Sequence, residues 1–199
     1  MRSKRGLNKQ PQDLNIELIK GFYDKAKADR LFDSLLNSEE IEYQSRNIKL
    51  FGKVYKQPRL ISWHGDPKAS YTYSGELFKP TPWTKDLKKI KGDLKEKLDV
   101  DFNSVLLNLY RDGQDSMGLH SDDEKELGKN PVIASLSLGE TRRLRFSHRT
   151  KKESFNLELC HGDLLVMSGE TQELYKHELP KSKKELGPRL NLTFRKIHI

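Results

Sequence analysis

Two stretches in the first half of the chain place apolar residues at the spacing of a helix. The first predicts a helix that ends near Asn37. The second predicts a helix with Thr84 as its N-cap, because a hydroxyl at that position can accept a backbone N–H. The apolar positions are Ala26, Leu31, Phe32, Leu35 and Leu36 in the first stretch, and Leu87, Ile90, Leu94 and Leu98 in the second. We expect both apolar stripes to pack against a core.

From about residue 103 the pattern changes to short segments rich in leucine, β-branched and aromatic residues, separated by Gly, Pro, Asn and Asp. The segments are NSVLLNLYR, PVIASLSL, RRLRFSHR, FNLELC, DLLVMS and PRLNLTFRKI. Several short strands at close spacing are typical of an all-β sandwich or barrel. We therefore predict a mainly β protein of the α+β class, in which N-terminal helices pack against a C-terminal β core.

Composition narrows the class of protein. A chain of 199 residues corresponds to one domain, and its single cysteine, Cys160, excludes an intrachain disulfide and favours a reducing compartment. No run of about 18 apolar residues predicts a membrane span, and the N-terminus lacks the apolar core of a secretory signal. The net charge of +8 suits a polyanion such as nucleic acid. Residues 1–12 contain four basic residues and no acid, which predicts a flexible basic arm.

Three of the six histidines lie in His-x-Asp triplets. In a strand, residues two apart point to one face, so a His nitrogen and an Asp oxygen can share a metal ion. The triplets are His64-Gly-Asp66, His120-Ser-Asp122 and His161-Gly-Asp163. The glycines favour turns in the first and third, whereas the second follows a strand-like run and is the preferred metal pair.

A third ligand is needed downstream of this pair. Two histidines and one carboxylate form the ligand set of non-haem iron oxygenases. His177 fits an adjacent strand of a barrel, since a Pro-bounded loop and the last strand follow it. The downstream candidates are His148, His161, His177 and His198.

The last predicted strand has one polar and one apolar face. Its polar face consists of Arg189, Asn191, Thr193 and Arg195, and its apolar face of Leu190, Leu192 and Phe194. In a small barrel the polar face can line a cavity, where two guanidinium groups would meet a dianion. Asn108 and Tyr110 are also two apart and share a face. Together these residues predict a pocket for a small dicarboxylate beside a metal.

The motifs occur together between Gln57 and Ile197, and their joint pattern resembles the AlkB family of Fe(II)/2-oxoglutarate-dependent nucleic-acid demethylases. The resembling segments are PRLISWHGD, SYTYSG, NSVLLNLYRDGQDSMGLHSDDE, PVIASLSLGETRRLRF, HGDLLVMSGETQ, the lone His177 and PRLNLTFRKI. The resemblance implies one dioxygenase domain at residues 13–199. Within it, residues 13–100 would form helices and nucleotide-recognition hairpins, and residues 101–199 a double-stranded β-helix, or jelly roll.

The resemblance also assigns roles at the matching positions. The implied iron ligands are His120, Asp122 and His177. The implied contacts to the co-substrate 2-oxoglutarate are Asn108, Tyr110, Arg189, Asn191 and Arg195. Arg189 matches the partner of the distal carboxylate, and Arg195, also counted as catalytic, matches the arginine near the C1 carboxylate. His161 and Asp163 match an inter-strand turn. Fe(II), 2-oxoglutarate and O2 are the implied cofactors.

The implied reaction is oxidative demethylation of N1-methyladenine and N3-methylcytosine in DNA or RNA. The N-methyl group is hydroxylated and lost as formaldehyde, while 2-oxoglutarate becomes succinate and CO2. Enzymes that flip a base out of the helix hold it between aromatic side chains, and carboxylates suit a cationic base. The implied substrate-binding residues are Tyr71, Tyr73, Asp123, Glu124 and Arg59, with Trp63 as a weaker candidate.

The segment KLFGK places Phe51 where duplex-repairing relatives carry an apolar wedge, and Lys49 and Lys53 flank it as candidate phosphate contacts. The predicted hairpin at 147–155 is shorter than in relatives that grip both strands of a duplex. Its basic residues are Arg149, Lys151 and Lys152.

Three alternatives to DNA repair stay open at this point. The same chemistry could act on single-stranded RNA or on a substrate other than nucleic acid, or the chain could bind nucleic acid without catalysis. We expect a monomer in a bacterial cytoplasm or a eukaryotic nucleus, neither secreted nor bound to a membrane.

Overall fold

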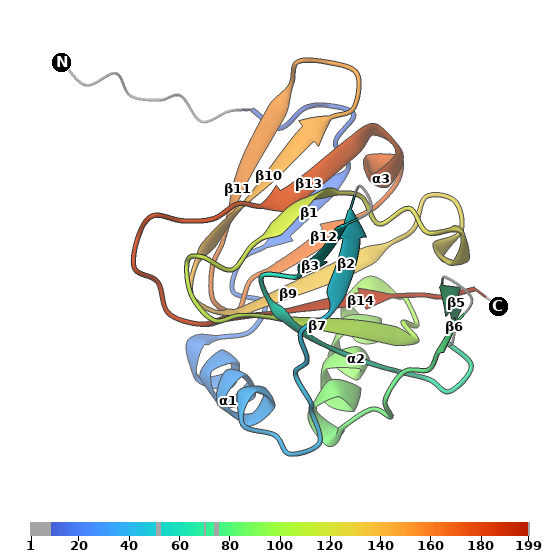
Figure 1. The fold of residues 1–199 in the computed structure, drawn as a ribbon, viewed down its shortest axis with the longest axis vertical. Coiled ribbons are helices and arrows are strands. Elements are labelled where there is room, and N and C mark those ends of the chain that lie inside the picture. The colour runs from blue at the N-terminus through green and yellow to red at the C-terminus, as the bar shows by residue number, and fades with distance from the viewer. Residues whose placement is uncertain (1–8, 51–52, 70, 74–75, 199) are drawn as a thin grey trace.

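Two antiparallel sheets form the centre of the computed structural model, which describes residues 9–50, 53–69, 71–73 and 76–198 (Figure 1). The strands of the larger sheet are β1 (Ile16–Ile19), β4 (Leu60–Gly65), β7 (Ser104–Tyr110), β9 (Ile133–Gly139), β12 (Leu164–Met167) and β14 (Arg189–Arg195). The strands of the smaller sheet are β8 (Met117–His120), β10 (Arg142–His148), β11 (Ser154–Leu159) and β13 (Tyr175–Leu179). Their spatial orders are β1-β12-β9-β14-β7-β4 and β11-β10-β13-β8.

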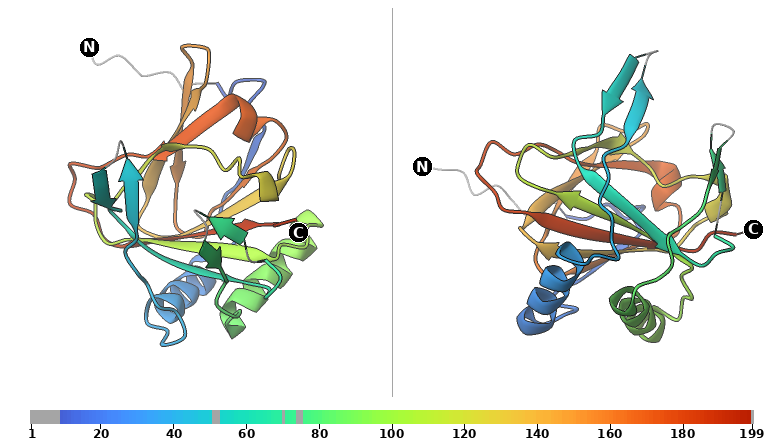
Figure 2. Two further views of the ribbon diagram at one scale, coloured as in Figure 1. Left: turned by 45° about the vertical axis from the view of Figure 1, so that its right-hand side comes forward. Right: turned by 60° about the horizontal axis from the view of Figure 1, so that its bottom comes forward.

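Two short hairpins stand apart from these sheets. They are β2 (Asn47–Leu50) with β3 (Lys53–Lys56), and β5 (Tyr71–Tyr73) with β6 (Glu76–Phe78). The helical elements are α1 (Lys25–Leu36), α2 (Lys85–Leu98), the one-turn α3 (Thr171–Leu174) and the 3-10 turn η1 (Lys125–Leu127). Figure 2 shows both hairpins on the side of the larger sheet opposite α1 and α2. None of the described helices is long and apolar enough to cross a membrane.

The end of the first long helix and the start of the second are where the sequence predicts them. The Asp24 side chain caps α1 by accepting the Lys27 N–H, and the helix ends at the cap residue Asn37. Thr84 caps α2 by accepting the Leu87 N–H at 3.3 Å. Asp99 ends α2 in the left-handed conformation, with φ of 53°.

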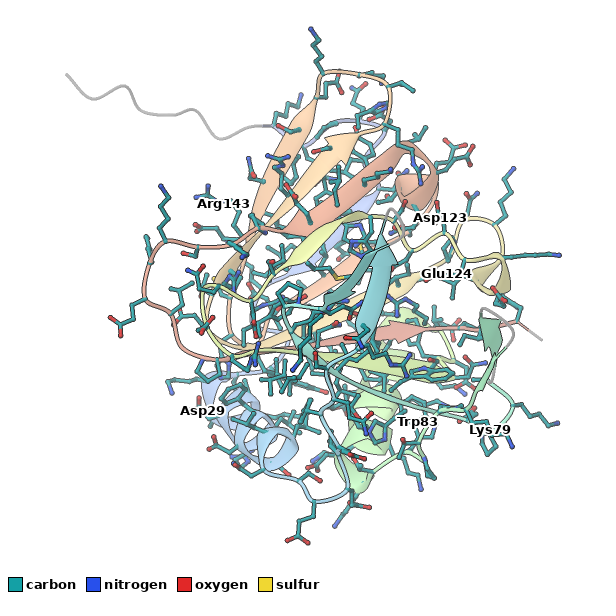
Figure 3. The ribbon with its side chains drawn as sticks, in the orientation of Figure 1. Asp29, Lys79, Trp83, Asp123, Glu124 and Arg143 are labelled. Carbon is teal, nitrogen blue, oxygen red and sulfur yellow. The ribbon has the colours of Figure 1, made fainter. Side chains whose placement is uncertain are left out.

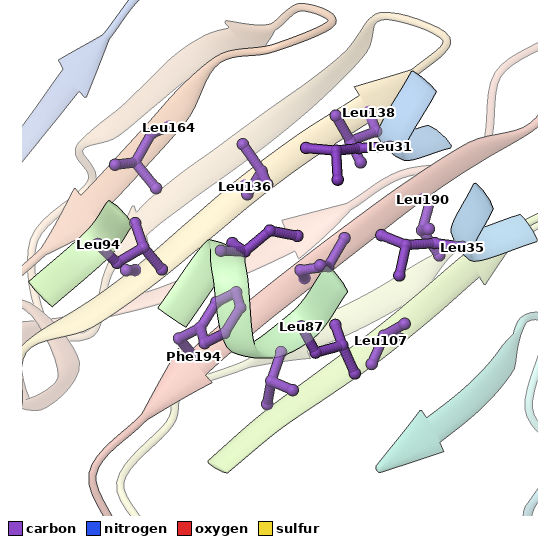
Figure 4. Packing of buried hydrophobic residues seen from close by; sticks show 14 of the residues in the cluster. Leu31, Leu35, Leu87, Leu94, Leu107, Leu136, Leu138, Leu164, Leu190 and Phe194 are labelled. Atoms are coloured by element: carbon purple, nitrogen blue, oxygen red, sulfur yellow. The ribbon is translucent and has the colours of Figure 1, made fainter. Parts of the chain in front are cut away.

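The apolar stripes of α1 and α2 cover one face of the larger sheet (Figure 4). The helices contribute Leu31, Leu35, Leu87 and Leu94, and the strands contribute Leu107, Leu136, Leu138, Leu164, Leu190 and Phe194. A second apolar cluster, which includes Phe146, Leu159 and Tyr175, joins the smaller sheet to the opposite face of the larger one. Because both faces of the larger sheet are buried, the polar residues of β14 are enclosed between the two sheets.

The six strand segments expected after residue 103 coincide with β7, β9, β10, β11, β12 and β14, so the mainly β expectation is confirmed. The sequence pattern does not reveal β1 and β4, which extend the larger sheet from the N-terminal half. β1 has only four residues, which is too short for a periodicity to stand out. Two facing antiparallel sheets of this kind are the arrangement of a jelly roll.

Candidate metal and co-substrate site

The pairing of β8 with β13 brings two histidines together. His120 is the register partner of His177, and their ring centroids lie 4.3 Å apart. Asp122 follows β8, is 3% exposed, and places Oδ1 3.8 Å from His120 Nε2. One ligand atom from each of the three residues lies within 4.8 Å of the others. Two imidazoles and a carboxylate at this spacing fit a single non-haem iron ion.

The protonation states of this trio suit metal binding. His120 Nδ1 donates to the Gly118 carbonyl oxygen at 2.9 Å, which orients the ring and leaves Nε2 as the nitrogen that faces Asp122. Burial and the nearby His120 lower the pKa of His177 to about 4. Burial acts to raise the pKa of Asp122, but Arg195 and the two histidines outweigh it and hold this pKa below its ordinary value. The trio therefore offers a neutral His177 imidazole, an ionised Asp122 carboxylate and the Nε2 atom of His120.

The polar face of β14 lines a cavity between the sheets, as the alternation of the last strand predicts. The β14 residues in its wall are Arg189, Asn191, Thr193 and Arg195. β7 adds Asn108 and Tyr110, because the register pairs Asn108 with Asn191 and Tyr110 with Arg189. The side chains of His120, Asp122 and His177 line the same cavity. All five residues expected to contact 2-oxoglutarate are thus brought together beside the candidate metal ligands.

Arg189 is a buried cation that lacks an anion. It is 2% exposed, its Nη2 donates to Ser137 Oγ at 2.9 Å, and its buried Nε has no hydrogen-bond partner. The described residues offer it no carboxylate, and burial lowers its pKa to about 10. A buried charge normally has a partner, so this arrangement fits a carboxylate of 2-oxoglutarate.

Two serines of β9 bind the polar side chains of β14, one of them in the cavity wall, and both were missed by the sequence analysis. Asn191 Nδ2 donates to Ser135 Oγ at 2.8 Å, and Ser137 holds Arg189. A signal existed, because the two serines alternate with leucines in a strand that is otherwise apolar. Gln172, whose Oε1 accepts the Asp122 N–H at 3.0 Å, was also missed, and the sequence holds no comparable signal for it.

A second cavity of about 420 Å³ opens on His120 and Asp122 from the outside. Its volume is within the range of small-ligand pockets, about 300–1,000 Å³. Arg59, just before β4, and Trp63, in β4, line this cavity, so both of these substrate-binding candidates face the groove. Arg59 is 7% exposed and donates from Nε to Asn108 Oδ1 at 2.8 Å, which joins the groove wall to the co-substrate pocket. Trp63 donates to Ser104 Oγ at 2.7 Å.

The two acidic candidates after β8 point to different places (Figure 3). Glu124 lines the groove, and Glu126, which the sequence analysis did not single out, lines it too. Asp123 instead lies 2.6 Å from Arg149 Nη2 and lines a separate cavity. Tyr71 and Tyr73 lie in β5, whereas Phe51, the wedge candidate, lies outside the described residues.

The other histidine candidates make structural contacts. His64 is fully buried, with Nδ1 2.8 Å from the Pro82 carbonyl oxygen. Asp163 accepts the N–H groups of Gly21 and Cys160 in the turn before β12, in agreement with the turn interpretation. His148 accepts backbone N–H groups of its own hairpin through Nδ1, and His198 donates its backbone N–H to Glu126.

Comparisons with known proteins agree with this geometry. Residues 15–195 match the model of the 2OG-Fe(II) oxygenase superfamily. Human "DNA oxidative demethylase ALKBH2" is 39% identical over 186 residues, covering 88% of this chain and 70% of the relative. Human "Alpha-ketoglutarate-dependent dioxygenase alkB homolog 3" is 38% identical over 191 residues, covering 91% of this chain and 65% of the relative. An ALKBH2 relative from Bos taurus is covered to 66% of its length.

A solved structure, that of OsALKBH1, superposes with a TM-score of 0.64 at 17% identity, covering 94% of this chain and 100% of the other. A likeness at that identity supports the jelly-roll fold alone. The match over most of the chain to the superfamily and to two AlkB homologues settles the family. The chain belongs to the AlkB family of 2OG-Fe(II) oxygenases, dioxygenases that use Fe(II), 2-oxoglutarate and O2.

Proposed function

We propose that this protein demethylates alkylated bases of nucleic acids, with N1-methyladenine and N3-methylcytosine as its lesions. The observation that carries the proposal is the groove that opens on His120 and Asp122. It has arginines, Arg46 and Arg59, and carboxylates, Glu124 and Glu126, in its lining. Arginines attract phosphates, and carboxylates attract a base that bears a positive charge. The relatives named as demethylases support the same reaction.

The co-substrate and the metal would bind to different walls of the inner cavity. His120, Asp122 and His177 would hold Fe(II), and Arg189 and Asn191 would bind one carboxylate of 2-oxoglutarate. Bound together with O2, these groups would supply the oxidant that converts the N-methyl group to N-hydroxymethyl, with 2-oxoglutarate becoming succinate and CO2. The N-hydroxymethyl group then leaves as formaldehyde and restores the base.

The side chains of the protein position and shield the reactants in this scheme. Tyr110 packs on Arg189, with the guanidinium carbon 5.4 Å from the ring centroid. Leu106 and Met117 line both the inner cavity and the groove, so they limit the entry of water between the two. Glu124 and Glu126 would hold the cationic base at the groove. No side chain needs to act as a nucleophile, because the cofactors supply the oxidising chemistry.

Single-stranded nucleic acid is the preferred form of substrate in this proposal. The hairpin residues Arg149 and Lys151, which are candidates for gripping a duplex, form ion pairs within the protein. Arg149 lies 2.6 Å from Asp123, and Lys151 lies 2.6 Å from Asp13. Cations engaged in such pairs have less charge to offer a second strand. RNA therefore remains a candidate polymer beside DNA.

Matched oligonucleotides with one N1-methyladenine test the proposal. The protein, reconstituted with Fe(II) without oxygen, receives O2, 2-oxoglutarate and single-stranded DNA, duplex DNA or single-stranded RNA. Mass spectrometry measures restored adenine and formaldehyde, and Asp122→Ala is the control. We expect restoration that is fastest on a single strand and absent in the control. A protein that binds iron but restores none of the three substrates would contradict the assignment.

A further inference from the structure

The candidate ligand Asp122 lies outside the paired strands. β8 ends at His120, so the backbone of residues 121–123 follows the last position at which β8 pairs with β13. A buried backbone N–H still needs an acceptor. For Asp122 that acceptor is the side chain of Gln172, which is 3% exposed and places Oε1 3.0 Å from the amide nitrogen. The Gln172 side chain thus supplies the hydrogen-bond acceptor that a neighbouring strand would otherwise provide.

Gln172 is itself held in place. Its Nε2 lies 3.5 Å from Met167 Sδ, which leaves Oε1 directed at Asp122. Its neighbour Thr171 accepts the Asn15 N–H at 3.0 Å and donates to the Asn15 carbonyl oxygen at 2.9 Å. These contacts fix the one-turn helix α3 against the N-terminal segment.

Arg149 holds the same loop from the solvent side. Its Nη2 contacts the side chains of Ser121 and Asp123, which flank Asp122, and reaches the Gln172 carbonyl oxygen at 3.3 Å. The loop is therefore bound to α3 by an inner contact, Gln172, and by an outer one, Arg149. The outer pair is partly exposed, so its contribution is the smaller one.

The position of α3 connects the three ligands. The helix leads directly into β13, which carries His177, and Gln172 reaches back to the loop that follows His120. We propose that Gln172 is a positioning residue that sets the Asp122 carboxylate relative to the two imidazoles, with Arg149 as a weaker support. The inference rests on the iron centre of the proposed function and is independent of the base that is demethylated.

Manganese binding tests this role without the reaction. The metal-free protein is titrated with Mn(II), and electron paramagnetic resonance measures the free ion. Gln172→Met keeps the shape of the side chain but removes the acceptor. We expect its Kd for Mn(II) to rise about tenfold or more, in the range typical of residues that orient metal ligands, about 10- to 100-fold. The absorption spectrum of bound Co(II) is expected to change as well. Gln172→Glu keeps an acceptor oxygen and is expected to stay within about threefold of the parent.

Thr171→Val is the matched control. Thr171 is as buried as Gln172 and lies in the same helical turn, but it binds Asn15 instead of the ligand loop. We expect this variant to lower the Tm and to leave the Kd for Mn(II) within about threefold. Arg149→Met is expected to have an effect smaller than that of Gln172→Met.

Two results would overturn the inference. One is a Kd for Gln172→Met within threefold of the parent, and the other is an equal loss in Gln172→Met and Thr171→Val. Should Gln172→Met not fold, Gln172→Asn carries the test, because its shorter amide does not reach Asp122, and a loss of about tenfold is expected here too. If the parent protein binds Mn(II) no better than Asp122→Ala does, the proposed metal site itself is wrong. That result differs from a failure of the proposed role of Gln172, in which the parent binds Mn(II) and Gln172→Met binds it equally well.

Discussion

Two regions of the molecule carry the same motif and use it differently. In the turn at residues 161–163, both Asp163 oxygens accept backbone N–H groups, from Gly21 and Cys160, and His161 Nδ1 accepts the Gly139 N–H. In the loop at residues 120–122, a side chain from another element binds the backbone N–H of Asp122. Gln172 accepts the Asp122 N–H, and the Asp122 carboxylate faces the site, where Oδ1 accepts from Arg195 Nη2 at 2.8 Å.

The intervening residue reinforces this difference. Gly162 has a φ of 82°, and a Cβ there would lie 2.3 Å from the Tyr23 carbonyl oxygen, so no other residue fits the turn. The comparison teaches that a candidate ligand carboxylate is distinguished, among the described residues, by having no backbone N–H bound to it, since Asp122 accepts from the side chain of Arg195 whereas Asp163 caps a turn. The same motif becomes structural where backbone N–H groups bind its carboxylate.

The largest effect is expected for Asp122→Ala. Losing a ligand oxygen should reduce Mn(II) affinity more than about a hundredfold and abolish demethylation, since second-sphere changes alone cost about 10- to 100-fold. Titration with Mn(II) measures the loss, and thermal unfolding serves as the control for folding. Mn(II) affinity equal to the parent would show that Asp122 is no ligand.

Two buried arginines, Arg142 and Arg189, also differ in whether backbone groups bind their polar atoms. The guanidinium of Arg142 donates hydrogen bonds to the carbonyl oxygens of Asp112, Asp115 and Pro180, whereas Arg189 Nε has no hydrogen-bond partner. We expect Arg189→Met to weaken 2-oxoglutarate binding by about 2 kcal/mol or more, which is ~30-fold in KM. The Tm of the metal-free protein should hold or rise, because a buried unpaired charge is removed.

Arg142→Met provides the contrast to this variant. It should lower the free energy of unfolding by about 2–3 kcal/mol, because it leaves three loop carbonyls without their donor. Denaturant unfolding and KM measured on both variants check the pair. A stability loss for Arg189→Met equal to that for Arg142→Met would contradict the distinction between them.

Asp163→Ala should affect stability without affecting the metal. Two backbone N–H groups lose their acceptor, which should lower the free energy of unfolding by about 1–3 kcal/mol. Denaturant unfolding measures that loss, and Mn(II) titration should return the affinity of the parent. Asp163→Asn, which keeps one acceptor oxygen, should lose less. A metal affinity that fell with Asp163→Ala would place this triplet in the site.

The smallest effect concerns His64, the histidine of the first triplet. Burial lowers its pKa below the ordinary value of 6.5, so the unfolded chain binds a proton at a pH where the folded protein does not. Stability should therefore fall as the pH falls through 6.5 and stop falling below the pKa in the folded state. Tm measured between pH 7.5 and 5.5 should fall less in His64→Gln than in the parent. The exposed-residue variant His198→Gln should keep the slope of the parent.

Sequence reasoning succeeded where the pattern is local. The stripe behind Thr84 defined α2, and the alternation in PRLNLTFRKI placed Arg189 and Asn191 on the enclosed face. It was incomplete where the contact is distant. Asp123, expected in the base pocket with Glu124, pairs with Arg149, 26 residues away, and its role toward a base stays a prediction. β1 was missed because four residues are too few for a periodicity to stand out, and β4 was missed as well.

The sequence by itself determined the two helices, six of the strands after residue 103, the two faces of the last strand and the resemblance to a family. These depend on the spacing of side chains along one element, which is set by the geometry of helices and strands. Only the tertiary structure decided that backbone N–H groups occupy the Asp163 carboxylate, which acid faces the groove and which side chain accepts the Asp122 N–H. Those outcomes depend on strand register and on side chains such as Gln172, 50 residues from Asp122, and local spacing does not encode such contacts.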